Sequence, residues 1–261
     1  MSIHASAIIE PGAEIGSGCT VGPFCHIGKA VRLGDGVRLH SHVAITGDTI
    51  IGDETEIWPF ASVGSQPQDL KFAGEQTRLE IGECNMIREG VSINPGTAGG
   101  GGVTKIGDDC LFMLGTHVGH DCTVGNRVVM ANHASLAGHV EVADGAVIGG
   151  LAGIHQFVRI GEGAIIGALS MVVADVIPFG SVVGERPKLS GLNLVGLKRR
   201  GIPRAEISAL RAAFKVLFAE SGTLKTRAEA MADAEDNPLV QQMLAFILED
   251  SERSFTTPKA K

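Results

Sequence analysis

Two histidines and an aspartate lie within five residues of one another in HVGHDCTVGN, the segment at residues 117–126. Imidazole exchanges protons near neutral pH, and a carboxylate beside it can orient the ring and raise its basicity. His117, His120 and Asp121 are therefore the residue types that general acid–base chemistry needs. Whether they can act together depends on the direction of each side chain, which the surrounding sequence pattern determines.

The surrounding sequence repeats every six residues. An apolar residue recurs at every sixth position through residues 3–63, 81–93 and 106–172, and glycine often follows it. This pattern is typical of a parallel β-helix, in which short strands are joined by tight turns and three hexads complete one coil. Two inserts, near residues 65–80 and 97–105, interrupt the repeat. We therefore predict a mainly β fold for most of the chain.

The same repeat predicts which side chains point inward. The fourth residue after each repeated aliphatic residue is also small or β-branched, so both positions should face the interior. Four cysteines occupy this second position and are interpreted as structural: Cys19, Cys25, Cys110 and Cys122. None of the nine histidines falls at either position, so all should point outward. A structural or surface role is the simpler interpretation for the four histidines of the first coils, His4, His26, His40 and His42.

Coils of eighteen residues would stack a group of polar residues on one outer strip. Residues one coil apart should lie about 4.8 Å apart, the spacing of neighbouring strands. The strip contains His120, Asp121, Gly138, His139, His155 and Gln156. A histidine base, a carboxylate and a glycine N–H that can face a developing oxyanion form the layout that acyl transfer needs. A polar subunit interface would explain the same strip.

The hexads stop after Gly184, and the sequence then changes character. Pro203 followed by Glu206 indicates a helix start, and apolar residues at helical spacing follow it. We predict a β-helix over residues 1–184 and a C-terminal helical domain over residues 185–261.

The beginning of this second part is basic. Between Glu185 and Lys215 there are eight basic residues and two acidic ones, although the whole chain has a net charge of −7. The dense LKRRG cluster suggests an anionic partner, while a solvated helix face is the simpler alternative.

Composition argues against several classes of protein. The net charge of −7 argues against a general nucleic-acid binder. The five cysteines show no CxxC pairing, which argues against a zinc ribbon or a disulfide framework. The chain begins MSIHASAIIE and has no long apolar run, so we expect a cytoplasmic protein without a membrane span.

Several motifs occur in a fixed order along this scaffold. They are QDLKFAGE at 68–75, HVGHDCTVGN at 117–126, LAGHV at 136–140, IHQF at 154–157 and GLNLVGLKRRG at 191–201. With the hexads, both inserts and the helical tail, the sequence closely resembles the UDP-N-acetylglucosamine O-acyltransferase family, which catalyses the first step of lipid A biosynthesis. The resemblance covers nearly the whole chain.

The resemblance implies a homotrimer of left-handed parallel β-helices with active sites in the clefts between subunits. The implied reaction moves a (R)-3-hydroxyacyl group from acyl carrier protein to the glucosamine 3-hydroxyl of UDP-N-acetylglucosamine. It implies no metal and no cofactor. An acceptor with a 3-amino group, which would give an amide, remains an alternative.

The resemblance also implies a role for each matching residue. His120 would be the general base, Asp121 its orienting partner, and the Gly138 amide the oxyanion donor. Residues expected to bind the sugar and phosphates are Gln68, Asp69 and Lys71. Residues expected to line the substrate cleft are His117, His139, His155 and Gln156. Residues expected to hold the nucleotide are Asn193, Arg199 and Arg200. Ala168 would form the floor of the acyl groove and favour a medium-length chain.

Three positions depart from the expected pattern. Asn94-Pro95 replaces a His-Arg pair, Phe72 replaces a tyrosine, and Val195 replaces a glutamate near the nucleotide. The last change puts one ribose or uracil contact in doubt.

Two other functions fit parts of the sequence. A γ-type carbonic anhydrase would need three histidines that converge on zinc from neighbouring subunits, for which His117, His139 and His155 are candidates. Asp121 and LKRRG would then lack a purpose. A structural or carrier-protein-binding solenoid without activity is the other alternative, and it would consume no thioester.

Overall fold

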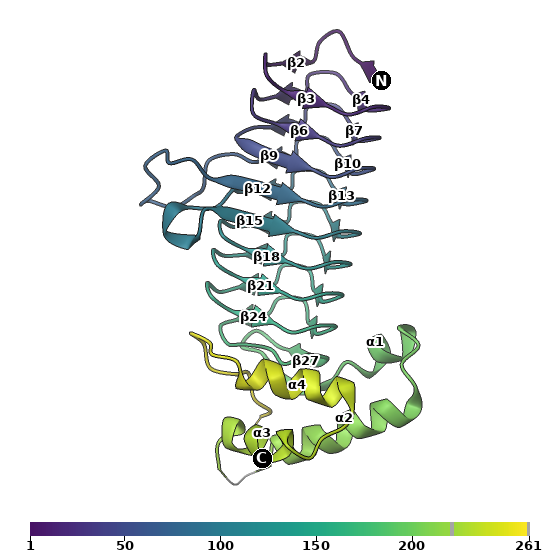
Figure 1. Cartoon of the computed structure of the whole chain (residues 1–261), viewed down its shortest axis with the longest axis vertical. Coiled ribbons are helices and arrows are strands. Elements are labelled where there is room, and N and C mark those ends of the chain that lie inside the picture. The colour runs from purple at the N-terminus through teal and green to yellow at the C-terminus, as the bar shows by residue number, and fades with distance from the viewer. Residues whose placement is uncertain (220–221, 260–261) are drawn as a thin grey trace.

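The computed structural model describes residues 1–219 and 222–259. Its main body is a parallel β-helix, a column of stacked coils whose short strands form three sheets along the axis (Figure 1). The predicted coil length appears in the strand pairing. Ile27 pairs with Ile45, and Val118 pairs with Leu136, each pair being eighteen residues apart.

The strands are assigned to the three sheets as follows. The first sheet contains β1 (Ser2–Ile3), β4 (Thr20–Val21), β7 (Arg38–Leu39), β10 (Glu56–Ile57), β13 (Met86–Ile87), β16 (Leu111–Phe112), β19 (Val129–Met130), β22 (Val147–Ile148), β25 (Ile165–Ile166), β27 (Gly180–Val183) and β28 (Lys188–Leu192). The second contains β2 (Ile8–Ile9), β5 (His26–Ile27), β8 (Ala44–Ile45), β11 (Ser62–Val63), β14 (Ser92–Ile93), β17 (His117–Val118), β20 (Ser135–Leu136), β23 (Gly153–Ile154) and β26 (Met171–Val172). The third contains β3 (Glu14–Ile15), β6 (Arg32–Leu33), β9 (Asp48–Ile51), β12 (Arg78–Ile81), β15 (Val103–Ile106), β18 (Thr123–Val124), β21 (Glu141–Val142) and β24 (Arg159–Ile160).

The interior of the coils forms the apolar core. Repeated aliphatic residues such as Ile45 and Leu136 are completely buried, as the hexad pattern predicts. The four cysteines predicted to point inward are also buried, whereas Cys84 is exposed. Burial raises the pKa of Cys122 to about 12, so its reactive thiolate form is scarce at neutral pH. The structural interpretation of these four cysteines is therefore confirmed.

The corners of the coils require an unusual backbone conformation. At many corners the third residue after the inward aliphatic residue has a positive φ, which costs free energy in most residue types. Asp121, His139 and Phe157 have φ values of 59°, 61° and 63° and occupy the same corner of three successive coils. The corner geometry therefore stacks these three residues in one column.

Two loops leave the coils at the predicted inserts. The first runs from β11 to β12, and the second runs from β14 to β15 and contains the short 3₁₀ helix η1 (Ala98–Gly100). Both project from the same side of the column, on the left in Figure 1. They are the only long excursions from the described coils, so they can cover the outer strip on that side.

In the part of the chain that the structure describes, four helices follow the coils. They are α1 (Leu194–Arg199), α2 (Arg204–Leu217), α3 (Leu224–Ala232) and α4 (Pro238–Leu248). Helix α2 begins after Pro203, as predicted, packs against α3 and α4, and buries Leu210 and Leu217. β28 follows residue 184 but pairs antiparallel with β27, which precedes it, so the first sheet continues past that residue. The exact domain boundary at residue 184 therefore stays a prediction. Within the described residues, no helix is long and apolar enough to cross a membrane.

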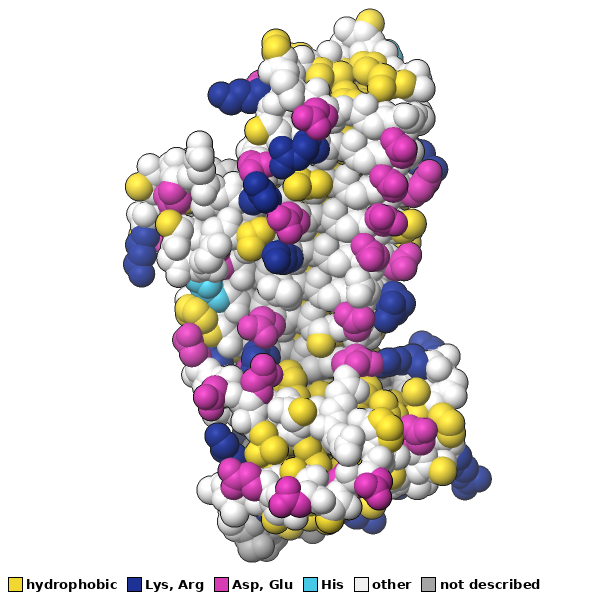
Figure 2. All heavy atoms as spheres, viewed as in Figure 1, with side chains coloured by type: hydrophobic (Ala, Val, Ile, Leu, Met, Phe, Trp, Pro, Cys, Tyr) yellow, Lys and Arg dark blue, Asp and Glu magenta, His cyan; other side chains and the backbone are white. Residues whose placement is uncertain are grey.

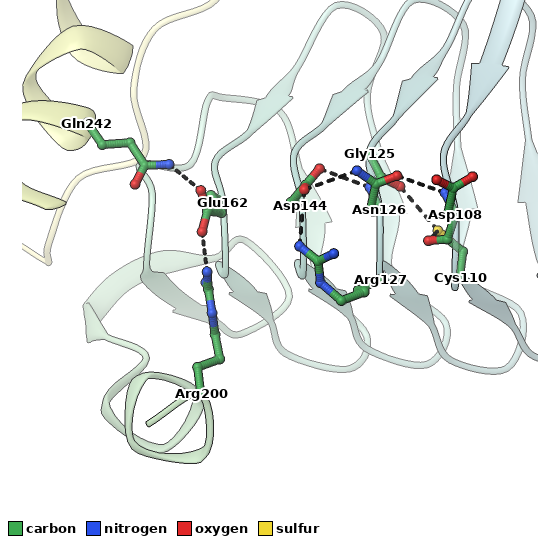
Figure 3. A network of polar contacts seen from close by, with 9 residues as sticks. All are labelled: Asp108, Cys110, Gly125, Asn126, Arg127, Asp144, Glu162, Arg200 and Gln242. Atoms are coloured by element: carbon green, nitrogen blue, oxygen red, sulfur yellow. Dashed lines mark hydrogen bonds and ion pairs between the residues drawn. The ribbon is translucent and has the colours of Figure 1, made fainter. Parts of the chain in front are cut away.

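An acidic corner runs along the edge where the third sheet turns into the first, on the right in Figure 2. There a side chain accepts a hydrogen bond from the backbone of the preceding coil: Asp144 from Asn126 N at 2.9 Å, and Asn126 from Asp108 N at 2.8 Å (Figure 3). The same corner ends at Glu162, which contacts Arg200 and Gln242 instead (Figure 3). Glu162 thus joins the coils to the helical part.

Candidate active site

His120 and Asp121 form a hydrogen-bonded pair. The imidazole Nδ1 lies 2.7 Å from Asp121 Oδ2, and each residue is only 9% exposed. A carboxylate can only accept, so Nδ1 carries the proton in this pair. The unshared electron pair of neutral His120 therefore lies on Nε2, the atom that could take a proton from a substrate.

The Asp121 carboxylate is held by Thr97. Oδ1 accepts from the Thr97 backbone N at 2.8 Å, and Oδ2 accepts from Thr97 Oγ1 at 2.6 Å. The Asp121 backbone N donates to Thr104 Oγ1 at 2.8 Å. Both threonines belong to the second insert, whose Gly100 backbone lies so close to the carboxylate that a Cβ there would clash with it. The insert therefore fixes the acid that orients His120.

Gly138 lies directly against the His120 ring. A Cβ at residue 138 would come within 2.6 Å of His120 Nε2, so glycine is required for this approach. Within the described part of the chain, the Gly138 N–H donates to no acceptor. The predicted base, orienting acid and amide donor are therefore neighbours in the folded chain.

His139 completes this group from the next coil. Its Nε2 is 3.8 Å from Asp121 Oδ2, and its ring meets the His120 ring edge-on with a centroid distance of 5.0 Å. The other face of His139 stacks on Phe157 at 4.5 Å. Aromatic stacking in the corner column thus fixes the His139 ring beside the dyad.

The possible metal ligands on this strip differ from the proposed zinc set. Among the described residues, the group whose ligand atoms lie within 4.8 Å of one another is His120, Asp121 and His139. Both Asp121 oxygens already accept hydrogen bonds, and His120 Nδ1 donates to one of them. This geometry fits a proton-transfer dyad, and within one chain it does not bring together His117, His139 and His155, which the carbonic anhydrase alternative would take from neighbouring subunits.

His117 lies on β17 on the same side as the dyad. Its Nδ1 is 2.7 Å from Ser92 Oγ on the paired strand β14. Burial lowers the pKa of His117, and the nearby charge of His120 lowers it further. A neutral His117 is therefore favoured at this position.

The first insert brings two predicted substrate residues to the dyad. Asp69 and Lys71 line one surface hollow together with Asp121, His139 and Phe157. Asp69 Oδ1 accepts from the Lys71 backbone N at 3.0 Å, which fixes the local turn. Gln68 is exposed and does not line this hollow.

Two of the departures from the expected pattern affect the same loop. Asn94 is buried and donates through Nδ2 to Ser65 O at 3.0 Å, so it holds the start of the insert. Phe72 lines a separate hollow with Pro95. Val195, the third departure, is 60% exposed on α1.

His155 and Gln156 lie on the outer strip beyond His139, and both contact Arg253. Arg253 Nη2 is 2.9 Å from His155 Nδ1, and Arg253 Nε donates to Gln156 O at 2.9 Å. Sequence reasoning missed Arg253, as it missed Thr97 and Thr104. The hexad register could not predict these contacts, because all three residues lie outside the hexads.

The predicted nucleotide residues lie beyond the last coil, on and around α1. Asn193 caps α1 by accepting from Gly196 N at 2.9 Å, and it donates to Gly163 O at 3.0 Å. Arg200 forms an ion pair with Glu162 (Figure 3), whereas Arg199 is exposed. Within this single chain, these three residues make no contact with the His120 dyad.

Ala168 is exposed on the next outer face, just after β25. Its backbone lies against Gly149 one coil earlier, where a Cβ would come within 2.5 Å of Ala168 N. This close packing keeps the backbone at Ala168 in a fixed position.

Comparison with known proteins identifies relatives over the whole chain. The family described as UDP N-acetylglucosamine O-acyltransferase, domain 2, matches residues 175–256. The acyl-(acyl-carrier-protein)–UDP-N-acetylglucosamine O-acyltransferase of Paracoccus denitrificans is 59% identical over 202 residues, which cover 77% of each chain.

Solved structures agree with this relationship. A UDP-N-acetylglucosamine acyltransferase crystal structure has 44% identity and a TM-score of 0.96 and covers 100% of both chains. The UDP-N-acetylglucosamine acyltransferase from Campylobacter jejuni has 39% identity and a TM-score of 0.94, covering 99% of this chain and 100% of that one. The predicted left-handed parallel β-helix with a C-terminal helical region is confirmed. The chain belongs to the UDP-N-acetylglucosamine O-acyltransferase family.

Proposed function

We propose that this enzyme transfers a (R)-3-hydroxyacyl group from acyl carrier protein to the 3-hydroxyl of UDP-N-acetylglucosamine, the first step of lipid A biosynthesis. The observation that carries this proposal is the His120–Asp121 dyad beside Gly138. The name of the Paracoccus denitrificans relative supplies the substrate classes, because it combines acyl carrier protein with UDP-N-acetylglucosamine.

In the proposed reaction, His120 Nε2 takes the proton of the sugar 3-hydroxyl while that oxygen attacks the thioester carbonyl carbon. Asp121 keeps the ring oriented and stabilises the imidazolium that forms. The carbonyl oxygen becomes an oxyanion, to which the Gly138 N–H would donate. The C–S bond then breaks, and the departing thiolate takes the proton from His120, which regenerates the free base.

The remaining predicted residues would bind the two substrates. Asp69 and Lys71 share the hollow with Asp121 and His139, so they can contact a sugar nucleotide placed beside the dyad. Arg199 is an exposed cation that could pair with a diphosphate. Gln68, His117, His155 and Gln156 would complete the cleft, which we propose lies between subunits of a cytoplasmic homotrimer.

The test is an assay with purified full-length protein. A panel of 3-hydroxyacyl carrier-protein thioesters would be offered with UDP-N-acetylglucosamine or its 3-amino analogue, and products identified by mass spectrometry. We expect an O-acylated sugar nucleotide and release of the carrier thiol. Folded protein that transfers no acyl group from any thioester to either sugar would contradict the proposal. Stoichiometric zinc with carbon dioxide hydration would favour the carbonic anhydrase alternative instead.

A further inference from the structure

The segment after α4 returns to the coils and is anchored on both sides of Arg253. Ser251 Oγ donates to Asp175 Oδ2 at 2.7 Å, and Asp175 N donates to Ser254 O at 2.8 Å. Asp175 is completely buried and also binds Arg159, through Nε at 2.8 Å. Thr256 N donates back to Asp175 O at 2.7 Å. Residues 251–256 are therefore fastened to the end of the β-helix.

This anchoring places the Arg253 guanidinium on the substrate strip. Arg253 Nη2 lies 2.9 Å from His155 Nδ1, and Nε donates to Gln156 O at 2.9 Å. Its neighbour Glu252 lines the hollow that also contains Asp121 and His139. The C-terminal segment therefore reaches the same outer strip as the dyad.

The contact with Arg253 decides which nitrogen of His155 carries the proton. A guanidinium has only donors and stays charged, so His155 Nδ1 must accept and the proton of the neutral ring must be on Nε2. A competing acceptor, Gln156 O, lies 3.4 Å from the same Nδ1 and would favour the opposite tautomer. The shorter contact prevails, because the guanidinium has no atom that could accept a proton from Nδ1 at 2.9 Å.

We propose that Arg253 is a positioning residue that holds His155 as the neutral Nε2–H tautomer, so that His155 donates a hydrogen bond to an oxygen of the bound substrate. In the described chain, His155 Nε2 has no partner, and the side chain is exposed. His120 is held in the opposite tautomer, with Nδ1 protonated and Nε2 free to accept a proton. One strip thus contains a histidine base and a histidine donor, each set by a charged neighbour.

The tautomer can be measured without any assumption about the reaction. Nitrogen NMR of the full chain with ¹⁵N-labelled histidine distinguishes the protonated ring nitrogen, and His155→Gln identifies the His155 signals by their loss. We expect an Nε2–H signature in the wild type and a shift to Nδ1–H in Arg253→Ala, because Nδ1 can then donate to Gln156 O. Arg127→Ala, which removes an exposed arginine bound to Asp144 on another corner, is the control and should leave the signals unchanged. An unchanged tautomer in Arg253→Ala would overturn the proposal.

A kinetic test rests on the proposed function as well. Glutamine can place an amide donor near the position of Nε2, whereas asparagine reaches only the position of Nδ1. His155→Gln should therefore keep more activity than His155→Asn, even if Arg253→Ala folds poorly. A result in which His155→Asn equals or exceeds His155→Gln would contradict the donor role.

The double variant separates positioning from a purely structural effect. Arg253→Ala should raise the KM of one substrate about three- to tenfold, the range of one neutral hydrogen bond. The substrate whose KM rises, the acyl carrier protein thioester or the UDP-sugar, carries the recognised oxygen. When Arg253→Ala is made in the His155→Gln variant, it should raise this KM little further. If Arg253→Ala raises the KM equally in the wild type and in the His155→Gln variant, the positioning proposal is overturned. Complete absence of acyl transfer in the wild type would contradict only the proposed function.

Discussion

The imidazole ring of His120 occupies the space that a side chain on Gly138 would need. A Cβ on residue 138 would lie within 2.6 Å of His120 Nε2, the nitrogen that Asp121 leaves unprotonated. The position of the base therefore depends on the absence of a single methyl group one coil away.

Gly138→Ala should displace the His120 ring and lower kcat about 10²-fold, because misplacing a reacting group by about 1 Å has an effect of that size. The backbone φ of residue 138 is not in the left-handed region, so alanine fits the backbone there and the variant should still fold. The matched control is Gly153→Ala on β23, where a Cβ would meet nothing within 4 Å. Steady-state kinetics of both variants check this, and equal kcat values would contradict it.

The hexad period predicted the direction of side chains, and so it predicted that His120, Asp121, Gly138 and His139 would meet. It could do this because each coil repeats the same geometry over eighteen residues. Thr97 and Arg253 could not be predicted in this way. They lie in an insert and in the C-terminal segment, whose paths depend on tertiary contacts rather than on a period.

Asn193 has a structural role that the sequence did not predict. The family resemblance assigns Asn193 to nucleotide binding, and in the single chain its side chain caps α1 and donates to Gly163 O, so its place at the nucleotide stays a prediction. Short polar side chains favour helix N-caps for local reasons, and a sequence motif does not distinguish that role from ligand binding.

Replacing Arg199 and Arg200 by Ala should weaken UDP-sugar binding and reduce its dependence on ionic strength, since charge-assisted contacts to diphosphate would be lost. Arg199→Ala alone should lower affinity about tenfold with little change in melting temperature, because Arg199 is exposed. Arg200→Ala should also lower the melting temperature, since it breaks the contact with Glu162. Glu162→Gln is the control that removes this ion pair and keeps both arginines. Calorimetric titration at two salt concentrations that shows unchanged affinity and salt dependence in the double variant would refute the assignment.

Ala168 should limit the length of the acyl chain. One methylene in an apolar pocket is worth only about 1–3 kcal/mol of discrimination, so the wild type should prefer a medium-length donor and tolerate its neighbours. Ala168→Gly should move the optimum to longer chains and Ala168→Met to shorter ones. A series of acyl carrier protein thioesters measures this. If the wild type and both variants prefer the same acyl-chain length, Ala168 does not form the floor of the acyl groove. Leu169 and Met171 would then be the next residues to test.

His117 should make stability depend on pH. Burial lowers its pKa in the folded chain, whereas the unfolded chain keeps the ordinary value of about 6.5. Below that pH the unfolded state binds more protons, so acidification from about pH 7 to pH 5 should lower stability, and the effect should vanish above pH 7. Thermal unfolding of wild type and His117→Asn across this range checks it. If the melting temperatures of the two proteins change with pH in the same way, His117 does not contribute to the pH dependence of stability.

The most direct test of the general-base assignment is the kcat of His120→Ala with saturating acyl carrier protein thioester and UDP-N-acetylglucosamine. General-base catalysis typically contributes 10² to 10⁴, so we predict that kcat falls at least about 10²-fold. The fold and the oligomeric state should be retained, because Thr97 still donates two hydrogen bonds to the Asp121 carboxylate. A variant that keeps more than half of the wild-type turnover while remaining folded in the same assembly would show that His120 is not the base.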